Sequence, residues 1–234
     1  MRDLFCRRLL VHPRHLWLAP GLLLALLPSA AAAAALPTAA EQIAGAVQAA
    51  PADRRDGAQV LGYTVVAEKE VVQVLRPGSN DLVCLADKPG DEKWSVACYH
   101  QSLEPFMRRG RELEAAGVPG EERMQRRWAE ADAGSLAMPK TPATLYVLSG
   151  TRFDAATGKV IDPYLRYVVY TPYATQETTG LPLSPPGPGG PWIMFPGTAG
   201  AHIMINPPRE SAPPTAPAPL PKANLSTSAG TAAG

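Results

Sequence analysis

The two ends of this 234-residue chain limit where a hydrophobic core can form. At the N-terminus, four arginines accompany an apolar stretch, Leu16–Leu27, which runs into a series of alanines. Basic residues, an apolar segment and small residues in this order are typical of a secretory signal peptide, which we predict to cover residues 1–35. At the other end, residues 207–234 are rich in proline, alanine and small polar residues and predict a disordered tail. A core must therefore form between these two segments.

An uncleaved membrane anchor is the alternative to a cleaved signal. The stretch Leu16–Ala35 just reaches the ~20 residues that a membrane span needs. Pro20, Pro28 and the weakly apolar alanines disfavour stable retention in the bilayer. Arg7 and Arg8 loosely resemble the arginine pair of a twin-arginine signal, so the export route stays open. We expect a periplasmic or extracellular protein with no stable membrane insertion after cleavage.

The net charge gives no reason to expect a nucleic-acid partner. Four of the 22 basic residues and one of the 21 acidic residues lie within the first 35, which leaves a net charge of −2 for the rest of the chain. Binding of nucleic acid or of an acidic membrane surface depends on clustered positive charge. Neither kind of partner is expected.

Only two cysteines, Cys84 and Cys98, follow the signal segment. Two thiols in an oxidising compartment usually pair, so we predict a structural disulfide between them. In the chain-entropy model, a closed loop of this length is worth about 3 kcal/mol. A redox or metal-binding pair is the alternative, but the spacing matches no zinc motif.

The pattern between the two ends predicts a single α+β domain over residues 59–206, preceded by a mobile leader at 36–58. Runs rich in valine, isoleucine and tyrosine separated by turn residues indicate strands. The expected fold is an antiparallel sheet of about six or seven strands, with two helices at about 102–133 on one face. The strands before residue 100 are expected to form a meander, in which each strand pairs with the next.

Two helices are predicted between the two groups of strands. Ser102 can cap the first, and Pro105 lies in its first turn, where proline is tolerated. The segment Gly117–Gly120 ends this helix, and the second begins at Glu121. The abundant arginines alternate with glutamates, as at Glu122 and Arg126, which is typical of a solvated helix face with ion pairs.

Sequence motifs of the common enzyme classes are absent. There is no G-x-S-x-G, Walker A, dinucleotide-binding glycine pattern or H-E-x-x-H. Only His100 and His202 follow the signal segment, and a nucleophilic triad would need one of them beside a hydroxyl and a carboxylate. Thr198 and Asp162 are available to His202, although nothing in the sequence brings them together. A hydrolase is therefore the weakest of the functions considered.

Residues 189–206 carry a resemblance to a known group of proteins. They read Gly-Gly-Pro-Trp-Ile-Met-Phe-Pro-Gly-Thr-Ala-Gly-Ala-His-Ile-Met-Ile-Asn. The segment resembles the C-terminal signature, PWxMFPGT followed by AHxM, of a family of small exported bacterial proteins with no known activity. The resemblance implies export and a shared β-core, and it implies no reaction.

The same segment is expected to form an antiparallel hairpin. A five-residue loop, Pro196–Gly200, falls within the usual length range of hairpin loops. With Phe195 opposite Ala201, Met194 faces His202 and Trp192 faces Met204. Side chains two residues apart share a face of a strand, so these four side chains are expected on one face.

Two thioethers and an imidazole form a soft ligand set that suits Cu(I). Met194, His202 and Met204 are therefore candidate metal ligands, with Trp192 placed to cover the ion through a cation–π contact. Ordinary core packing explains the same pattern, and a one-residue change of register would remove it. Because Ile193, Phe195, Ile203 and Ile205 are more apolar, their face is expected to be the main core face, with the His202 face under a loop, a helix or a shallow pocket.

The sequence thus favours a non-enzymatic exported domain that binds a small ligand or another envelope protein. Binding of Cu(I) at the final hairpin is the first alternative, and hydrolysis is the second. The sequence names no catalytic residue and no other cofactor.

Overall fold

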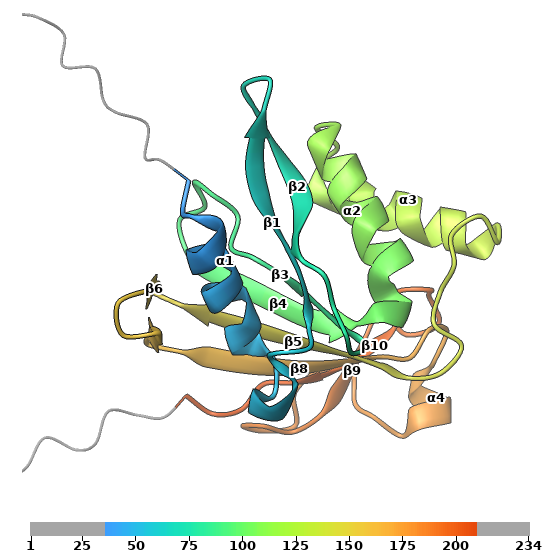
Figure 1. Cartoon of the computed structure of the whole chain (residues 1–234). Coiled ribbons are helices and arrows are strands. Elements are labelled where there is room, and N and C mark those ends of the chain that lie inside the picture. The colour runs from blue at the N-terminus through green and yellow to red at the C-terminus, as the bar shows by residue number, and fades with distance from the viewer. Residues whose placement is uncertain (1–35, 210–234) are drawn as a thin grey trace, which may run out of the picture. The chain divides into compact units, whose positions relative to one another are not determined.

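The computed structural model describes residues 36–209, which belong to one compact unit beginning at Leu36. Eight strands form one mostly antiparallel sheet, with helices beside both of its faces (Figure 1). The predicted α+β class is confirmed, with eight strands in place of six or seven. The predicted signal peptide and the tail from residue 210 lie outside the described residues. Among residues 36–209, no helix is both long enough and apolar enough to cross a membrane.

The strands follow one another across the sheet in the order β2-β1-β3-β4-β5-β8-β10-β9. A separate short hairpin is formed by β6 (Arg152–Asp154) and β7 (Lys159–Ile161). The strands of the main sheet are β1 (Gln59–Val66), β2 (Lys69–Arg76), β3 (Leu82–Leu85), β4 (Trp94–His100), β5 (Ala143–Gly150), β8 (Tyr164–Tyr170), β9 (Trp192–Met194) and β10 (His202–Ile205).

The predicted meander is wrong at its third strand. β3 pairs with β1, in parallel, instead of with β2. The turn that follows β2 carries the chain across the end of the hairpin, where the N–H groups of Ser79 and Asn80 both donate to the carbonyl oxygen of Gly57. As a result β2 is left at the edge of the sheet, with β1 as its single strand partner among the described residues.

Residues 36–58 differ from the mobile leader that the sequence predicts. They form α1 (Ala39–Ala46) and two short 3-10 helices, η1 (Val47–Ala49) and η2 (Ala52–Arg54). Ala46 has no exposed surface, and α1 with η1 packs on one face of the sheet. Alanine side chains are small enough to let a helix approach a sheet closely. The close approach buries apolar surface on both the helix and the sheet, and this is why a weakly hydrophobic segment is packed here.

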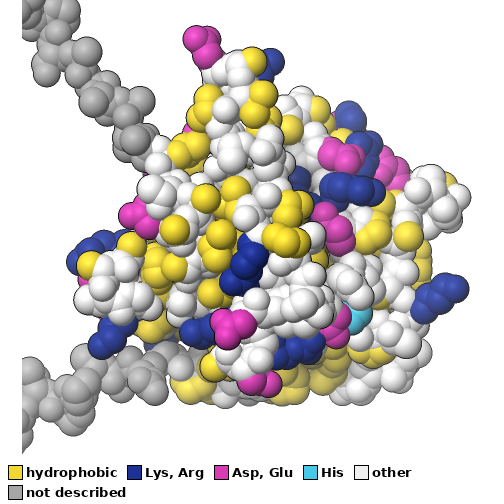
Figure 2. Space-filling model, viewed as in Figure 1, with side chains coloured by type: hydrophobic (Ala, Val, Ile, Leu, Met, Phe, Trp, Pro, Cys, Tyr) yellow, Lys and Arg dark blue, Asp and Glu magenta, His cyan; other side chains and the backbone are white. Residues whose placement is uncertain are grey.

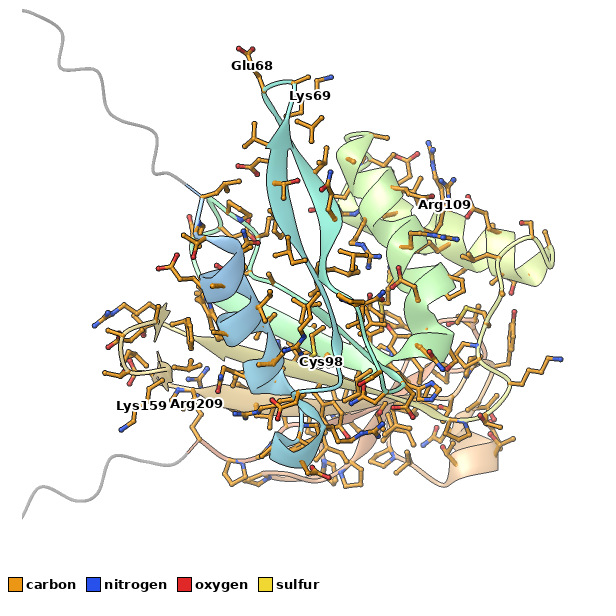
Figure 3. All side chains as sticks on the ribbon, viewed as in Figure 1. Glu68, Lys69, Cys98, Arg109, Lys159 and Arg209 are labelled. Atoms are coloured by element: carbon orange, nitrogen blue, oxygen red, sulfur yellow. A yellow bond between two sulfur atoms is a disulfide. The ribbon has the colours of Figure 1, made fainter. Side chains whose placement is uncertain are left out.

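The disulfide lies on that same face. Cys84 and Cys98 stand directly opposite each other on β3 and β4 and are bonded, as predicted. Both are fully buried beneath α1, near the centre of the sheet where Figure 3 labels Cys98.

The other face carries the two predicted helices, α2 (Glu104–Ala115) and α3 (Gly120–Asp132), preceded by η3 (Gln101–Leu103). Pro105 lies in the first turn of α2, as expected, and Phe106 and Leu113 are buried. Ser102 does not cap α2, because it lies inside η3, where its own N–H donates to the side chain of His100. Across the two helices, Arg109 is paired with Glu130 at 2.7 Å (Figure 3).

Candidate functional site

The final hairpin adopts the predicted register. His202 is paired with Met194, and Met204 is paired with Trp192. The four residues therefore share one face of β9 and β10, as the loop length and the period of two predicted. β10 also pairs with β8, so that His202 stands opposite Tyr170 on its other side.

The opposite face of the hairpin was expected to be the main core face, and this expectation is partly wrong. Ile193 is buried, but Ile203 and Ile205 are only half-buried, whereas His202 and Met204 are buried. Phe195 is not on the isoleucine face, because its φ of +52° turns the chain just after β9 and brings its ring to 5.7 Å from that of His202.

His202 is part of a row of aromatic rings beneath α2 and α3. Its ring centroid lies 5.1 Å from that of Tyr170, which in turn contacts Phe106 of α2. On the other side of His202, the ring centroid of Phe195 lies 5.1 Å from that of Trp128 of α3. The His202 face is thus covered by helices, one of the coverings that the sequence allowed, and His202 is only 9% exposed.

The hydrogen bond of His202 fixes its tautomer. Its Nδ1 lies 2.7 Å from the carbonyl oxygen of Gly200, which can only accept, so Nδ1 carries the proton. Burial lowers the pKa of His202, while the bond to Gly200 opposes this shift. The neutral ring therefore has an unprotonated Nε2, which is the form in which histidine binds a metal.

The predicted soft ligands differ in how accessible they are. Met204 is buried, whereas Met194 and Trp192 are half-buried. The indole Nε1 of Trp192 is buried and has no hydrogen-bond partner among the described residues. Within residues 36–209, no group of three or more His, Cys, Asp or Glu side chains could hold a metal ion, so a metal here would depend on the methionines. Metal binding by Met194, His202 and Met204 stays a prediction.

A groove that the sequence did not predict separates the β1–β2 hairpin from α2. The hairpin projects beyond the rest of the sheet, with α2 along one side of it (Figure 1). The groove has a volume of about 490 Å³. Its apolar side is formed by paired residues of the two strands, Leu61 with Val74 and Tyr63 with Val72.

Charged side chains of α2 form the opposite wall of the groove. Arg111 is paired with Glu104 at 2.6 Å and also donates to the hydroxyl of Tyr99, which donates to Glu104. Lys88 is paired with Glu114 at 2.8 Å. Burial raises the pKa of Tyr63 to about 12, and the nearby charge of Glu114 adds to this shift, so its phenol is neutral. The groove therefore combines an apolar floor with a charged wall, on which Glu104, Arg111, Lys88 and Glu114 are already paired.

The free edge of β2 runs along this groove. Val65 and Val74 are 59% and 54% exposed, although valines on paired strands of this kind usually pack against another layer. Figure 2 shows hydrophobic side chains along the projecting hairpin, below charged side chains at its tip. Figure 3 labels these charged residues as Glu68 and Lys69. The sequence indicated that these valines belong to strands, but not that their face is left uncovered.

Comparisons with known proteins identify no relative of this chain. It matches no family model, no curated protein and no solved structure. The resemblance that residues 189–206 carry stays a prediction.

Proposed function

We propose that this protein is an exported binding domain that takes an extended segment of an envelope protein along the edge of β2. The observation that carries the proposal is the free edge of β2 beside exposed valines. An added strand gains backbone hydrogen bonds from such an edge, while side-chain pockets give specificity. Without a partner, an exposed apolar edge strand is an aggregation hazard, which natural proteins usually block.

The backbone geometry supports this mode of binding. In an antiparallel pair, the backbone groups of alternate residues point toward the neighbouring strand and away from it. The N–H and C=O of Tyr63 both bond to the side chain of Gln42 on the side of β1 that faces away from β2. Its partner Val72 therefore directs its own N–H and C=O to the free edge, as does Glu70, two residues before it.

The side chains available to a partner are also defined. An incoming strand would place every second residue over the groove, next to Val72 and Val74. Those residues are expected to be apolar, because the charged groups of the groove wall already have partners within the protein. Fitting partners are thus extended segments with alternating apolar and polar residues.

Site-specific photo-crosslinking in intact cells tests the proposal. A crosslinker at Val74 is expected to give a discrete covalent adduct with one protein, whereas one at Leu183, which is equally exposed at 54%, is not. The substitution Glu70→Pro removes one outward N–H and is expected to abolish the Val74 adduct with little loss of stability, since proline is tolerated on edge strands. Equal labelling at both positions, or an adduct insensitive to Glu70→Pro, would contradict strand addition.

The export part of the proposal has its own test. A cleaved signal over residues 1–35 is supported by the order of basic, apolar and small residues. N-terminal sequencing of protein taken from the periplasm or the medium is expected to begin near Leu36. A product that begins at Met1 would rule out cleavage.

Cu(I) binding is the second candidate, because the register brings Met194, His202 and Met204 to one face and leaves Nε2 of His202 unprotonated. Titration with Cu(I) kept reduced by ascorbate is expected to show one site, lost in Met194→Leu and retained in Met138→Leu. Equal affinity of the two variants would place the copper elsewhere.

A further inference from the structure

A second hollow, of about 480 Å³, lies where the start of β3 meets the end of β4 and η3. Its lining is mostly polar, unlike that of the groove beside β2. The polar residues that line it are Gln59, Asn80, His100, Gln101, Ser102 and Glu104. Asp81 is adjacent to this lining through its contact with His100.

A serine hydroxyl is hydrogen-bonded to an imidazole at this hollow. The Oγ of Ser102 lies 2.8 Å from Nδ1 of His100, and the backbone N–H of Ser102 also donates to Nδ1 at 3.2 Å. Because Nδ1 accepts the backbone N–H, it carries no proton, and the hydroxyl must donate to it. This is the arrangement in which an imidazole can remove a proton from a serine.

The second ring nitrogen faces a carboxylate. Nε2 of His100 lies 3.5 Å from Oδ2 of Asp81, whose other oxygen is paired with Arg54. The carbonyl oxygen of Asp81 also accepts the N–H of Gln101 at 2.7 Å, which fixes the turn before β3 against η3. Asp81 therefore stands beside the ring, at ion-pair distance from Nε2.

We propose that Ser102 is the nucleophile of an ester-hydrolysing site, with His100 as its general base and Asp81 as a positioning residue. A serine-histidine-aspartate triad usually contacts its serine through Nε2, and here Nδ1 takes that role. The side chains of His100 and Asp81 are each 37% exposed, so a substrate can reach the site from solvent. This activity goes beyond the binding function proposed above, and it uses a different surface.

The reaction balances with water as its one co-reactant. Oγ of Ser102 bonds to the ester carbonyl carbon while its proton passes to Nδ1 of His100, and the ester C–O bond then breaks as the leaving oxygen takes that proton. Water attacks the resulting acyl-serine and gives its proton to Nδ1. The Ser102–acyl bond breaks, the carboxylic acid leaves, and the proton returns to Oγ.

The surroundings define the class of substrate. The side-chain amides of Gln59 and Gln101 line the hollow and have no hydrogen-bond partner among residues 36–209, so either could donate to the developing oxyanion. Asp81 and Glu104 are each paired with an arginine, Arg54 and Arg111, so the carboxylates at the hollow already have partners and are not available to bind an ionic substrate. Small uncharged esters are therefore expected.

The proposal is tested with the processed, disulfide-bonded protein and p-nitrophenyl acetate as the substrate. His100→Asn is expected to lower kcat/KM about a hundredfold, the usual scale for loss of a positioned acid–base group, and Ser102→Ala, which removes the nucleophile, is expected to lower it by at least as much. Ser184→Ala, at an exposed serine away from the hollow, is the matched control and is expected to leave the rate unchanged. Asp81→Asn is expected to lower kcat with KM unchanged, which a purely structural role would not produce.

A covalent probe separates loss of activity from loss of folding. A fluorophosphonate is expected to attach to Ser102 of the folded protein, as located by peptide mass spectrometry, and not to Ser184. A turnover that is the same in Ser102→Ala and in the unchanged protein overturns the proposal. Absence of a Ser102 adduct in protein with normal thermal unfolding overturns it as well.

Discussion

The side-chain amide of Gln42 forms two hydrogen bonds with the backbone of Tyr63. Its Oε1 accepts the N–H of Tyr63 at 2.7 Å, and its Nε2 donates to the carbonyl oxygen of Tyr63 at 2.9 Å. β1 continues beyond β3, whose pairing with it ends at Leu61, so the next backbone groups on that side have no strand partner. Gln42, on α1, is the hydrogen-bond partner of these backbone groups. This contact joins the N-terminal helix to the hairpin that we propose as the binding surface.

Replacement of Gln42 is expected to destabilise the protein. Gln42→Ala leaves the N–H and C=O of Tyr63 without their partners, and an unsatisfied buried polar group costs about 1–3 kcal/mol. Urea unfolding measures the loss, with Gln125→Ala as the control because Gln125 is exposed on α3. Equal stabilities of the two variants would show that α1 contributes little to the fold.

Reduction of the disulfide is expected to lower the free energy of unfolding by about 3 kcal/mol, because the cross-link closes a loop of about 14 residues in the unfolded chain. The double variant Cys84→Ala/Cys98→Ala is expected to show the same loss and to be insensitive to reductant. Unfolding in urea with and without reductant measures both. Two free thiols in the intact mass of exported protein would contradict the bond itself.

Stability is expected to fall as the pH drops below about 6.5, because burial lowers the pKa of His202 from its ordinary value of 6.5. Below pH 6.5 His202 binds a proton in the unfolded chain but stays neutral in the native protein. The free energy of unfolding therefore begins to fall near pH 6.5 and continues to fall down to the lower native pKa. The contribution of the neutral ring is complete above 6.5.

The variant His202→Gln removes this titration. Urea unfolding at pH 7.5 and 5.5 is expected to show a smaller difference between the two pH values for the variant than for the unchanged protein. Gln125→Ala, at an exposed and non-titrating position of α3, is the control and is expected to retain the full difference. The same pH dependence in all three proteins would assign the effect to other groups.

The parts of the fold that were predicted from the sequence depend on local patterns. The register of β9 and β10 follows from the length of the loop between Phe195 and Ala201 and from the period of two along each strand. The start of α2 follows from Pro105, and its end and the start of α3 follow from the break at Gly117–Gly120. In each case neighbouring residues carry the whole signal.

The parts that were not predicted depend on contacts between distant segments. The positive φ of Phe195 reverses its expected face, and nothing in its sequence neighbourhood requires that conformation. The docking of α1 depends on small alanines and on Gln42, a residue type that usually indicates an exposed position. Covering of the His202 face depends on where the helices pack, which their periodicity does not specify.

The Ser102 cluster shows the same limit at a candidate site. The sequence offered His100 as one possible base, but Asp81 lies in a turn before β3 and Arg54 in the segment predicted to be mobile. Only the pairing of β3 with β4 brings Asp81 to the end of β4, beside His100. No fixed spacing in the sequence identifies a site whose residues lie on separate segments and come together only in the folded protein.

Gly200 is expected to be essential to the packing of α3 against the final hairpin. A Cβ at this position would collide with the indole Nε1 of Trp128, whose ring packs on Phe195. The large ring cannot move without disturbing the aromatic row that ends at His202, so Gly200→Ala is expected to cost about 1–3 kcal/mol, as overpacking usually does. Gly187→Ala is the matched control, because nothing lies within 4 Å of its Cβ position. Thermal and urea unfolding compare the two, and a Gly200→Ala protein as stable as Gly187→Ala would show that Trp128 is not held against the hairpin.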